Sequence, residues 1–410
     1  MTDTTRPTAA GPLPWRADEG PGRILELITT GRARTRTSIA QLTGLSRSTV
    51  GQRLDALFAA GLVKESDKSV PSRGRPSRAL QLNHAAGLII SVDIGEERTR
   101  VAITDLNAGI LAERVERLAV GEGPDVLLDK ITTTVRGMIG HADLGDKPVA
   151  GIGFGLPAPV DYEAGRVLGW SIMSGWDDYD IRGHLRRTWQ VPILIDNDVN
   201  LLTLAEHRRF WHDRSHLLYI KAGTGVGSGM VVGGRVNRGA QGAAGDIGHA
   251  HLSGFGDPQC RCGNRGCLES LVGGWALARD LRDRHQNNGH DARDVVDQVK
   301  GGDSAAVAAL RTAGRILGEA VAYATSLLNP DIIVLGGRLS TVGDHLMAGV
   351  REVIYQRSLP LATRQLQIVP TKYKSRAGIA GAAYLVRDHV LHPSTLDTTL
   401  ASGDSPFAAL

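Results

Sequence analysis

The sequence predicts an α/β protein with two parts, an N-terminal winged helix-turn-helix and a larger region of two related lobes. Three observations carry this prediction. The first 80 residues contain 13 basic and 7 acidic residues, a net charge of +6, whereas the remaining 330 have a net charge of −2. Helical spacing of apolar residues gives way to buried-strand patterns from residue 87 onward. The 51 glycines and the aromatic content of 4% are typical of an α/β chain with many tight turns.

The N-terminal part divides into a tail and a compact domain. Residues 1–17 are rich in Pro and Thr, and we expect a disordered tail there. Residues 18–82 form the predicted DNA-binding domain. Its first helix carries Ile24, Leu27 and Ile28 on one stripe.

A helix-turn-helix follows in the segment TRTSIAQLTGLSRSTVGQRLDALFAAGLVKE. Ile39 and Leu42 mark a short helix, Gly44 makes the turn, and Ser46 can cap a second helix. The buried face of that second helix consists of Val50, Leu54 and Leu57. We therefore expect the opposite face of this helix to read DNA.

The outward face of the second helix has the side chains that such reading needs. At about 100° per residue, Ser48, Thr49 and Gln52 lie away from the buried face. These short polar groups can reach base edges. Arg47 and Arg53 lie on the flanks, where they can contact phosphates or a guanine.

The segment GLVKESDKSVPSRGRPSRALQLN is interpreted as a strand, a basic turn and a returning strand. Arg73, Arg75 and Arg78 surround a glycine and a proline at the tip, which suits a wing lying along the DNA backbone or in a minor groove. The alternative is a three-helix module with a solvated run of charge. This alternative would require the helix cap, the glycine of the turn, the polar face of the second helix and the basic wing to coincide by chance.

The remainder shows the same pattern twice. GLIISVDIG and RVAITDL read as strands, DVLLDKITTTVRGMIG as a helix, and VAGIGFGLP and VPILIDND as further strands. A second set runs from LLYIKAGTGVGSGMVVGG to DIIVLGGRLS. We therefore expect lobe 1 at residues 83–200, completed by 375–390, and lobe 2 at 201–374. Residues 391–410 are expected to form a flexible tail.

Seven motifs carry a resemblance to a known family: DIG, GLPAPVD, DNDVN, AGTGVGSG, GAAGDIGH, CRCGNRGCLE and PDIIVLGGR. Their order and approximate spacing, across residues 85–390, resemble the ROK family of repressors, open reading frames and sugar kinases. The resemblance implies a two-lobed, actin-like sugar-kinase fold. The N-terminal winged helix-turn-helix makes the chain similar to the repressor branch.

All three cysteines lie in the stretch CRCGNRGCLES. His249, Cys260, Cys262 and Cys267 form a Cys₃His set that suits tetrahedral Zn²⁺, and four protein ligands leave no open position, which predicts a structural role. Buried or redox thiols are the alternative. An odd, clustered cysteine count excludes a disulfide framework and, with no signal peptide at the N-terminus, favours the reducing cytoplasm. No run of about 18 apolar residues is present, and we expect a soluble protein.

The resemblance also implies a sugar site. In the family's kinases, the residues corresponding to Asn197 and Asp198 bind sugar hydroxyls, and the aspartate is the catalytic base. Asp246, His249 and Glu269 would hold the other side of the ring, although Asp246 stands where the family usually has Glu. His249 would thus belong to both the zinc site and the sugar site.

The loop that binds ATP phosphates in the family's kinases distinguishes an active kinase from a protein that only senses sugar. Kinases of the family read Asp-x-Gly-Gly-Thr where this chain reads Asp93-Ile94-Gly95-Glu96-Glu97. Two carboxylates there would repel ATP phosphates. The sequence therefore favours a sugar-responsive repressor of carbohydrate genes, with Asp198 as a vestigial base.

Two other functional classes are alternatives to the sugar-responsive repressor. One is an active ATP-dependent sugar kinase with an added DNA-binding domain, and the other is a scaffold that binds neither sugar nor DNA. For the favoured repressor, the expected partners are a sugar or sugar-phosphate effector and double-stranded operator DNA. A homodimer or homotetramer would read an inverted repeat.

Overall fold

The structure is a computed structural model of the 410-residue chain. It describes residues 20–70, 77–96, 98–118, 120–141, 144, 147–168, 173, 175–285, 291–342 and 344–407. The N-terminal tail predicted at residues 1–17 lies outside these ranges. So do Arg73, Arg75 and Glu97.

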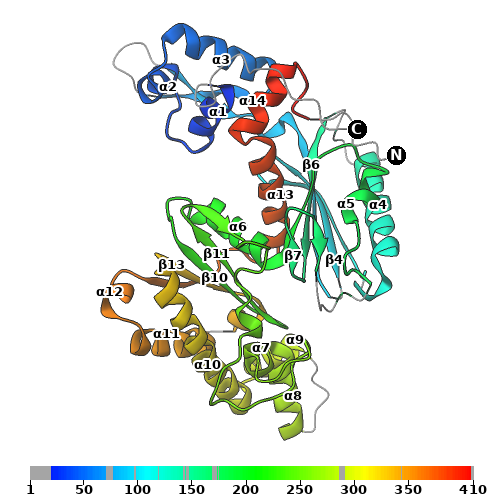
Figure 1. Ribbon diagram of the computed structural model, residues 1–410, viewed down its shortest axis with the longest axis vertical. Coiled ribbons are helices and arrows are strands. Elements are labelled where there is room, and N and C mark those ends of the chain that lie inside the picture. Colours follow the sequence, from blue (N-terminus) through cyan, green and yellow to red (C-terminus); the bar gives the residue numbers. More distant parts are fainter. Residues whose placement is uncertain are drawn as a thin grey trace, which may run out of the picture.

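The N-terminal domain is the predicted winged helix-turn-helix (Figure 1). It consists of α1 (Pro21–Thr29), α2 (Arg36–Thr43), α3 (Arg47–Ala59), β1 (Val63–Val70) and β2 (Ser77–Leu82). The two strands pair in an antiparallel hairpin, which is the wing. Val50, Leu54 and Leu57 of α3 are buried, as their spacing predicts.

Local signals define the ends of these helices. Thr35 and Ser38 form a reciprocal capping box at the start of α2. Gly44 ends that helix at φ 72°, a left-handed conformation that favours glycine. The Ser46 hydroxyl accepts a hydrogen bond from the Thr49 amide at 3.1 Å and caps α3. Leu42 is 54% exposed and lies outside the core.

Lobe 1 is built on a five-stranded sheet in the order β5-β4-β3-β6-β9. Its strands are β3 (Leu88–Ile94), β4 (Thr99–Asp105), β5 (Ile110–Glu116), β6 (Val149–Leu156) and β9 (Ile193–Asn197). The other elements are η1 (His84–Ala86), η2 (Val120–Glu122), α4 (Pro124–His141), β7 (Val160–Asp161), β8 (Arg166–Val167) and α5 (Ile181–Arg186). Successive residues of β3 face opposite sides, so that Leu88 and Ile90 pack in the core with α4 whereas Ile89 packs in the core with α13 (Ala377–Val390).

Lobe 2 is built on a second five-stranded sheet in the order β12-β11-β10-β13-β14. Its strands are β10 (Leu217–Ala222), β11 (Val226–Val232), β12 (Arg235–Asn237), β13 (Ile332–Gly336) and β14 (Gln367–Pro370). Its helices are η3 (Ile247–His249), α7 (Leu268–Val272), α8 (Gly274–His285), α9 (Ala292–Lys300), α10 (Ser304–Leu328), η4 (Arg338–Thr341), α11 (His345–Arg357) and α12 (Pro360–Thr363).

The two sheets have one topology, which confirms the prediction of two related lobes. In each sheet the first strand pairs antiparallel with the second, the second antiparallel with the third, and the first parallel with the fourth, which is parallel to the fifth. The helix α6 (Asp198–Phe210) lies between the lobes and contacts both sheets. The lobe boundary expected between residues 200 and 201 therefore falls inside a helix.

The C-terminal segment differs from the sequence expectation. Residues 391–410 were predicted to be a flexible tail, but α14 (Pro393–Ser402) packs against α1, as Figure 1 shows at the top of the molecule. Leu396 and Phe407 are buried in a core shared by the N-terminal domain and α13. Asp397 accepts a hydrogen bond from the Gly22 amide at 2.7 Å. The prediction of a flexible tail is wrong because contacts with residues at the far end of the chain order this segment.

No helix in the described ranges is both long enough and apolar enough to cross a membrane.

Candidate functional site

The site begins where β9 ends and α6 starts. Asn197 caps α6, its Oδ1 accepting hydrogen bonds from the amides of Val199 at 2.9 Å and Asn200 at 3.4 Å. Its Nδ2 donates to the Ala158 carbonyl at 3.0 Å. Asn197 is thus oriented by the helix it begins, and Asp198 follows as the first helical residue.

Glycines of the AGTGVGSG motif bring β11 close to α6. A Cβ at Gly227 would lie 3.0 Å from the Val199 side chain, and one at Gly229 would lie 2.2 Å from the Thr203 hydroxyl. These two glycines are needed for close packing of helix on strand. Their presence therefore has a structural reason that requires no nucleotide.

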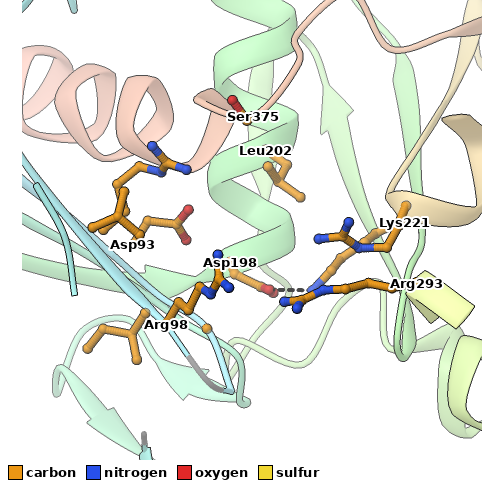
Figure 2. Close-up of a pocket in the computed structure, with 12 residues that line it drawn as sticks. Asp93, Arg98, Asp198, Leu202, Lys221, Arg293 and Ser375 are labelled. Atoms are coloured by element: carbon orange, nitrogen blue, oxygen red, sulfur yellow. Dashed lines mark hydrogen bonds and ion pairs between the residues drawn. The ribbon is translucent and has the colours of Figure 1, made fainter. Parts of the chain in front are cut away.

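Asp198 is held by a lysine from the other lobe. Lys221 Nζ of β10 donates to Asp198 Oδ2 at 2.5 Å (Figure 2). Burial lowers the pKa of Lys221, but the Asp198 carboxylate outweighs it and raises the pKa overall. This pair was not predicted from the sequence, although a lysine in the apolar strand LLYIKA is a signal that could have revealed it.

A second, partly buried carboxylate lies beside this pair. Burial, with repulsion from Asp198, raises the pKa of Asp93 at the end of β3 to about 6, while Lys221 and Arg100 oppose the shift. A Cβ at Gly378 of α13 would lie 2.4 Å from the Asp93 carboxyl group. The end of β3, the start of α6 and the start of α13 therefore meet at one point.

A pocket of about 340 Å³ opens between the lobes at this point (Figure 2). It is lined by Asp93, Ile94, Gly95, Arg98, Arg100, Val115, Asp198, Leu202, Lys221, Arg293, Arg338 and Ser375. Of the residues predicted to bind sugar, only Asp198 lines it. The basic residues of this lining were not identified from the sequence.

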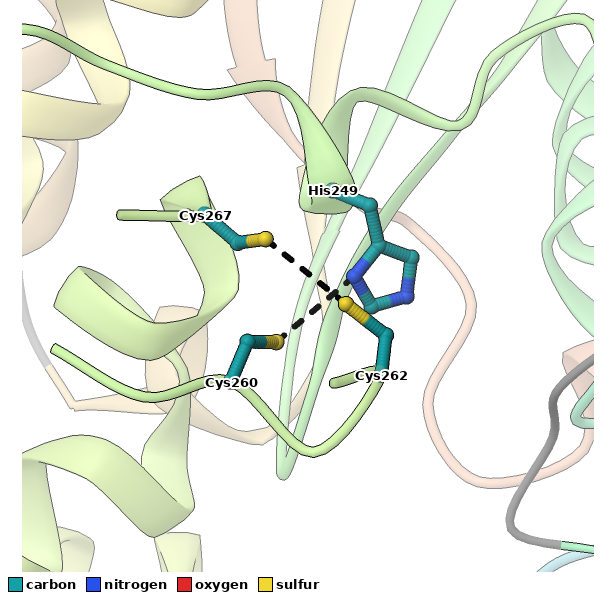
Figure 3. A group of neighbouring side chains, drawn as sticks. All are labelled: His249, Cys260, Cys262 and Cys267. Carbon is teal, nitrogen blue, oxygen red and sulfur yellow. Dashed lines mark hydrogen bonds between the residues drawn. The ribbon is translucent and has the colours of Figure 1, made fainter. Parts of the chain in front are cut away.

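The predicted metal ligands come together (Figure 3). One ligand atom from each of His249, Cys260, Cys262 and Cys267 lies within 4.8 Å of the others. Burial, with the neighbouring Cys262 and Cys260 sulfurs, raises the pKa of the Cys267 thiol to about 12. A metal ion at the centre would offset this effect, because a cation stabilises thiolates. The cluster can hold a metal ion.

The loop before the cluster is packed tightly on β11. A Cβ at Gly245 (φ 97°) would lie 2.4 Å from the Ser228 carbonyl oxygen, and one at Gly248 would lie 2.1 Å from that of Val226. Asp246, between these glycines, is exposed, as is His249. The GDIGH motif thus positions His249 through close backbone contact.

Glu269 is oriented toward the glycine-rich hairpin. Its Oε2 accepts from the Val226 amide at 3.0 Å, and its Oε1 accepts from Trp275 Nε1 at 3.2 Å. A Cβ at Gly225 would lie 2.4 Å from Oε2. Glu269 therefore supports the turn that follows β10.

The structure joins only some of the residues predicted to bind sugar. Asn197 and Asp198 are adjacent, and His249 belongs to the cysteine cluster. Among the described residues, no direct hydrogen bond or ion pair joins the first two to Asp246, His249 or Glu269.

Two further ion pairs, neither of them predicted from the sequence, join the two lobes. Arg238 Nη2 lies 2.6 Å from Asp196 Oδ2, and its guanidinium stacks 4.0 Å from the Tyr162 ring centroid. Glu96 lies 3.7 Å from Arg261, which sits between the first two cysteines. The loop that carries Cys260 and Cys262 therefore contacts the turn after β3.

The predicted DNA-reading residues are accessible on α3. Arg47, Ser48 and Gln52 are exposed, and Thr49 and Arg53 are partly exposed. The hydroxyls of Ser48 and Thr49 both contact Ser46 Oγ at 2.8 Å. On the described part of the wing, Arg78 is exposed.

Comparisons with known proteins agree with this architecture. Residues 89–389 match the model of the ROK family. The chain is 28% identical over 382 residues to the xylose repressor of Caldicellulosiruptor bescii, covering 90% of this chain and 95% of that protein. It is 29% identical over 251 residues to the glucokinase of Halalkalibacterium halodurans, covering 58% of this chain and 76% of the glucokinase.

One solved structure extends the match to the N-terminal domain. It is a ROK family transcriptional regulator described as a homologue of the Escherichia coli MLC protein, with a TM-score of 0.80 and 24% identity, and the match covers 93% of this chain and 98% of that one. At this identity the likeness concerns the fold. Because the family model covers most of the chain, from the first strand of lobe 1 to the end of α13, the chain belongs to the ROK family.

Proposed function

We propose that this protein is a sugar-responsive, DNA-binding transcriptional repressor of carbohydrate uptake or metabolism genes. The observation that carries the proposal is the winged helix-turn-helix joined to a ROK domain along one continuous core. The xylose repressor resembles the chain over nine-tenths of its length, whereas the glucokinase resembles little more than half of it.

DNA would be read by α3 and the wing. Gln52, Ser48 and Thr49 would contact base edges, and Arg47 and Arg53 would contact phosphates or a guanine. The wing-tip arginines Arg73 and Arg75 would lie along the backbone. A two-fold dimer would place two such helices on an inverted repeat.

The metal in the cluster would be Zn²⁺ with a structural role. Three thiolates and one imidazole are the ligand types of closed zinc sites. His249 Nδ1 lies 3.7 Å from Cys260 Sγ, so this ring nitrogen faces the cluster while the other remains available to a sugar hydroxyl. Asn197, Asp198, Asp246 and Glu269 would complete the sugar site.

Phosphotransfer is not expected. Asp198 Oδ2 accepts a hydrogen bond from Lys221 Nζ, so this oxygen is not free to accept a proton from a sugar hydroxyl. The carboxylate of Glu96 lies 3.7 Å from Arg261, between Cys260 and Cys262. The hydrogen bond from Lys221 to Asp198 is therefore a second reason against kinase activity, beside the carboxylates of the DIGEE sequence.

The test combines DNA binding with a kinase assay. Full-length protein is used to select an operator from random DNA, and Gln52→Ala is compared with Asp55→Ala, which changes another exposed residue of α3. Gln52→Ala should relax sequence preference, whereas Asp55→Ala should retain it. Equal operator affinity after deletion of residues 1–82 would contradict the proposal, as would ATP-dependent sugar phosphorylation above about 1 s⁻¹.

A further inference from the structure

The side chain of Arg238, which follows β12 in lobe 2, is bound by two groups of lobe 1. Its Nε donates to Asp196 Oδ2 at 2.8 Å, and its Nη2 lies 2.6 Å from the same oxygen. Its guanidinium lies over the ring of Tyr162, 4.0 Å from the ring centroid. A carboxylate and an aromatic face together recognise both the charge and the flat shape of arginine.

Both groups are held in place by lobe 1 itself. Asp196 Oδ1 accepts hydrogen bonds from the Asn197 amide and from Asn200 Nδ2, each at 2.9 Å. Arg182 Nη2 donates to the Tyr162 carbonyl at 2.9 Å, and Arg182 Nε donates to a carbonyl of β9 at 3.1 Å. Lobe 1 therefore offers Arg238 a binding surface whose two parts are fixed relative to each other.

Asp196 also depends on Arg238 for its charge. The Asp196 side chain is 2% exposed and that of Arg238 is 21% exposed. Burial raises the pKa of Asp196, and Arg238 is the largest influence that opposes this shift. Because a buried charge without its partner is strongly unfavourable, the carboxylate favours the arrangement of the lobes that keeps Arg238 beside it.

Arg238 begins a loop, residues 238–245, that packs on both lobes. A Cβ at Gly242, which has a φ of 87°, would lie 2.0 Å from a carbonyl oxygen of β7 in lobe 1. At the other end of the loop, the Gly245 carbonyl accepts hydrogen bonds from the amide and the hydroxyl of Ser228 in β11, at 3.1 and 2.7 Å. The loop is thus anchored on lobe 1 at its start and on lobe 2 at its end.

This loop connects the two halves of the proposed sugar site. It leads directly into Asp246 and His249, whereas Asp196 directly precedes Asn197 and Asp198. A shift of the loop on lobe 1 would therefore move one half of the site relative to the other.

We infer that Arg238 is a positioning residue of the sugar site: by binding Asp196 and Tyr162 across the lobes, it sets the distance between the two halves of that site. The inference rests on the proposed function and adds to it a residue that need not touch the sugar. Loss of this tie should leave fewer molecules with both halves in place, which weakens the apparent affinity for sugar.

The experiment separates positioning from stability. Full-length protein is titrated by calorimetry with glucose, xylose and N-acetylglucosamine, and thermal unfolding is measured on the same samples. Arg238→Met leaves the Asp196 charge buried without its partner and should lower the melting temperature. Combining it with Asp196→Asn removes that charge and should restore most of the lost stability. The double variant should nevertheless bind the best of the three sugars about tenfold or more weakly than the wild type does, because the tie between the lobes is still absent.

Two further variants complete the test. Arg238→Lys keeps the positive charge and should fold as the wild type does, but lysine lacks the flat fork of arginine, and sugar affinity should fall several-fold. Arg235→Met, which replaces an exposed arginine of β12, should match the wild type in stability and in sugar affinity. Wild-type sugar affinity in either Arg238→Lys or the double variant would overturn the inference, because Arg238 would then have only a structural role.

Operator titration of the wild type tests the proposed function separately. If the wild type binds no operator, or if none of the three sugars changes its operator affinity, the proposed function fails. If operator and sugar act as proposed but the Arg238 variants keep wild-type sugar affinity, only the role assigned to Arg238 fails.

Discussion

Replacing Asp397 should loosen the DNA-binding domain, because this residue caps a helix at the other end of the chain. The N-cap position of α1 is Gly20, which has no side chain to bond the first amides. Asp397 supplies that acceptor to the Gly22 amide at 2.7 Å, across 375 positions of sequence, and is itself buried. Loss of a helix N-cap costs about 0.5–2 kcal/mol.

The effect should appear as faster local opening of α1. A cost of one or two kcal/mol changes an opening equilibrium about 5- to 30-fold. In Asp397→Ala, hydrogen exchange of the α1 amides, followed by mass spectrometry, should accelerate by that factor. Asp397→Asn keeps an acceptor and should show a smaller change.

A matched control is Asp344→Ala. Asp344 also precedes a helix, α11, but its side chain makes no capping hydrogen bond. Its replacement should leave exchange in α1 unchanged. Wild-type protection of α1 in Asp397→Ala would refute the idea that α14 holds the domain in place.

Two further predictions concern charge and metal. The pKa of Asp93 is raised from 3.8 to about 6, so the folded state binds this proton more tightly and stability falls as pH rises from about 4 to 6. Asp93→Asn should therefore stabilise the protein at pH 7.5, by up to about 3 kcal/mol, and hardly at all at pH 4 in urea titrations; an equal gain at both pH values would contradict this cause. Cys262→Ala should lower bound zinc below one ion per chain and abolish the effect of sugar on operator affinity, while Ser253→Ala in the same loop keeps both. A normal sugar response in zinc-free Cys262→Ala protein would show that the metal does not shape the sugar site.

The N-terminal domain was predictable because its signals are local. Ser46, Gly44 and the spacing of Val50, Leu54 and Leu57 determine cap, turn and buried face within a short segment. The convergence of His249 with the three cysteines was equally predictable, since the cysteines lie within eight residues of one another. The repeated strand pattern predicted two lobes because the signal of each strand is also local in sequence.

The interlobe contacts were not predictable from these signals. Lys221 and Asp198 are 23 positions apart in different lobes, and their pairing depends on how the two sheets face each other. The end of the chain was mispredicted because PSTLDTTLAS has a weak apolar pattern, and packing on α1 and α13 orders it. The spacing of apolar residues shows which face of a helix or strand is buried. The contacts between lobes depend instead on which helices and strands pack against each other.

The docking of α14 has a consequence for how tightly DNA can be held. A domain joined through a single connection would lose rotational freedom when it binds an operator, and that loss weakens binding. Here the domain is attached through the chain at residue 83 and held again through α14, so much of that freedom is already lost on folding. In a dimer, two recognition helices preorganised in this way would favour one spacing of half-sites, and operators with an added or deleted base pair between half-sites would be bound poorly.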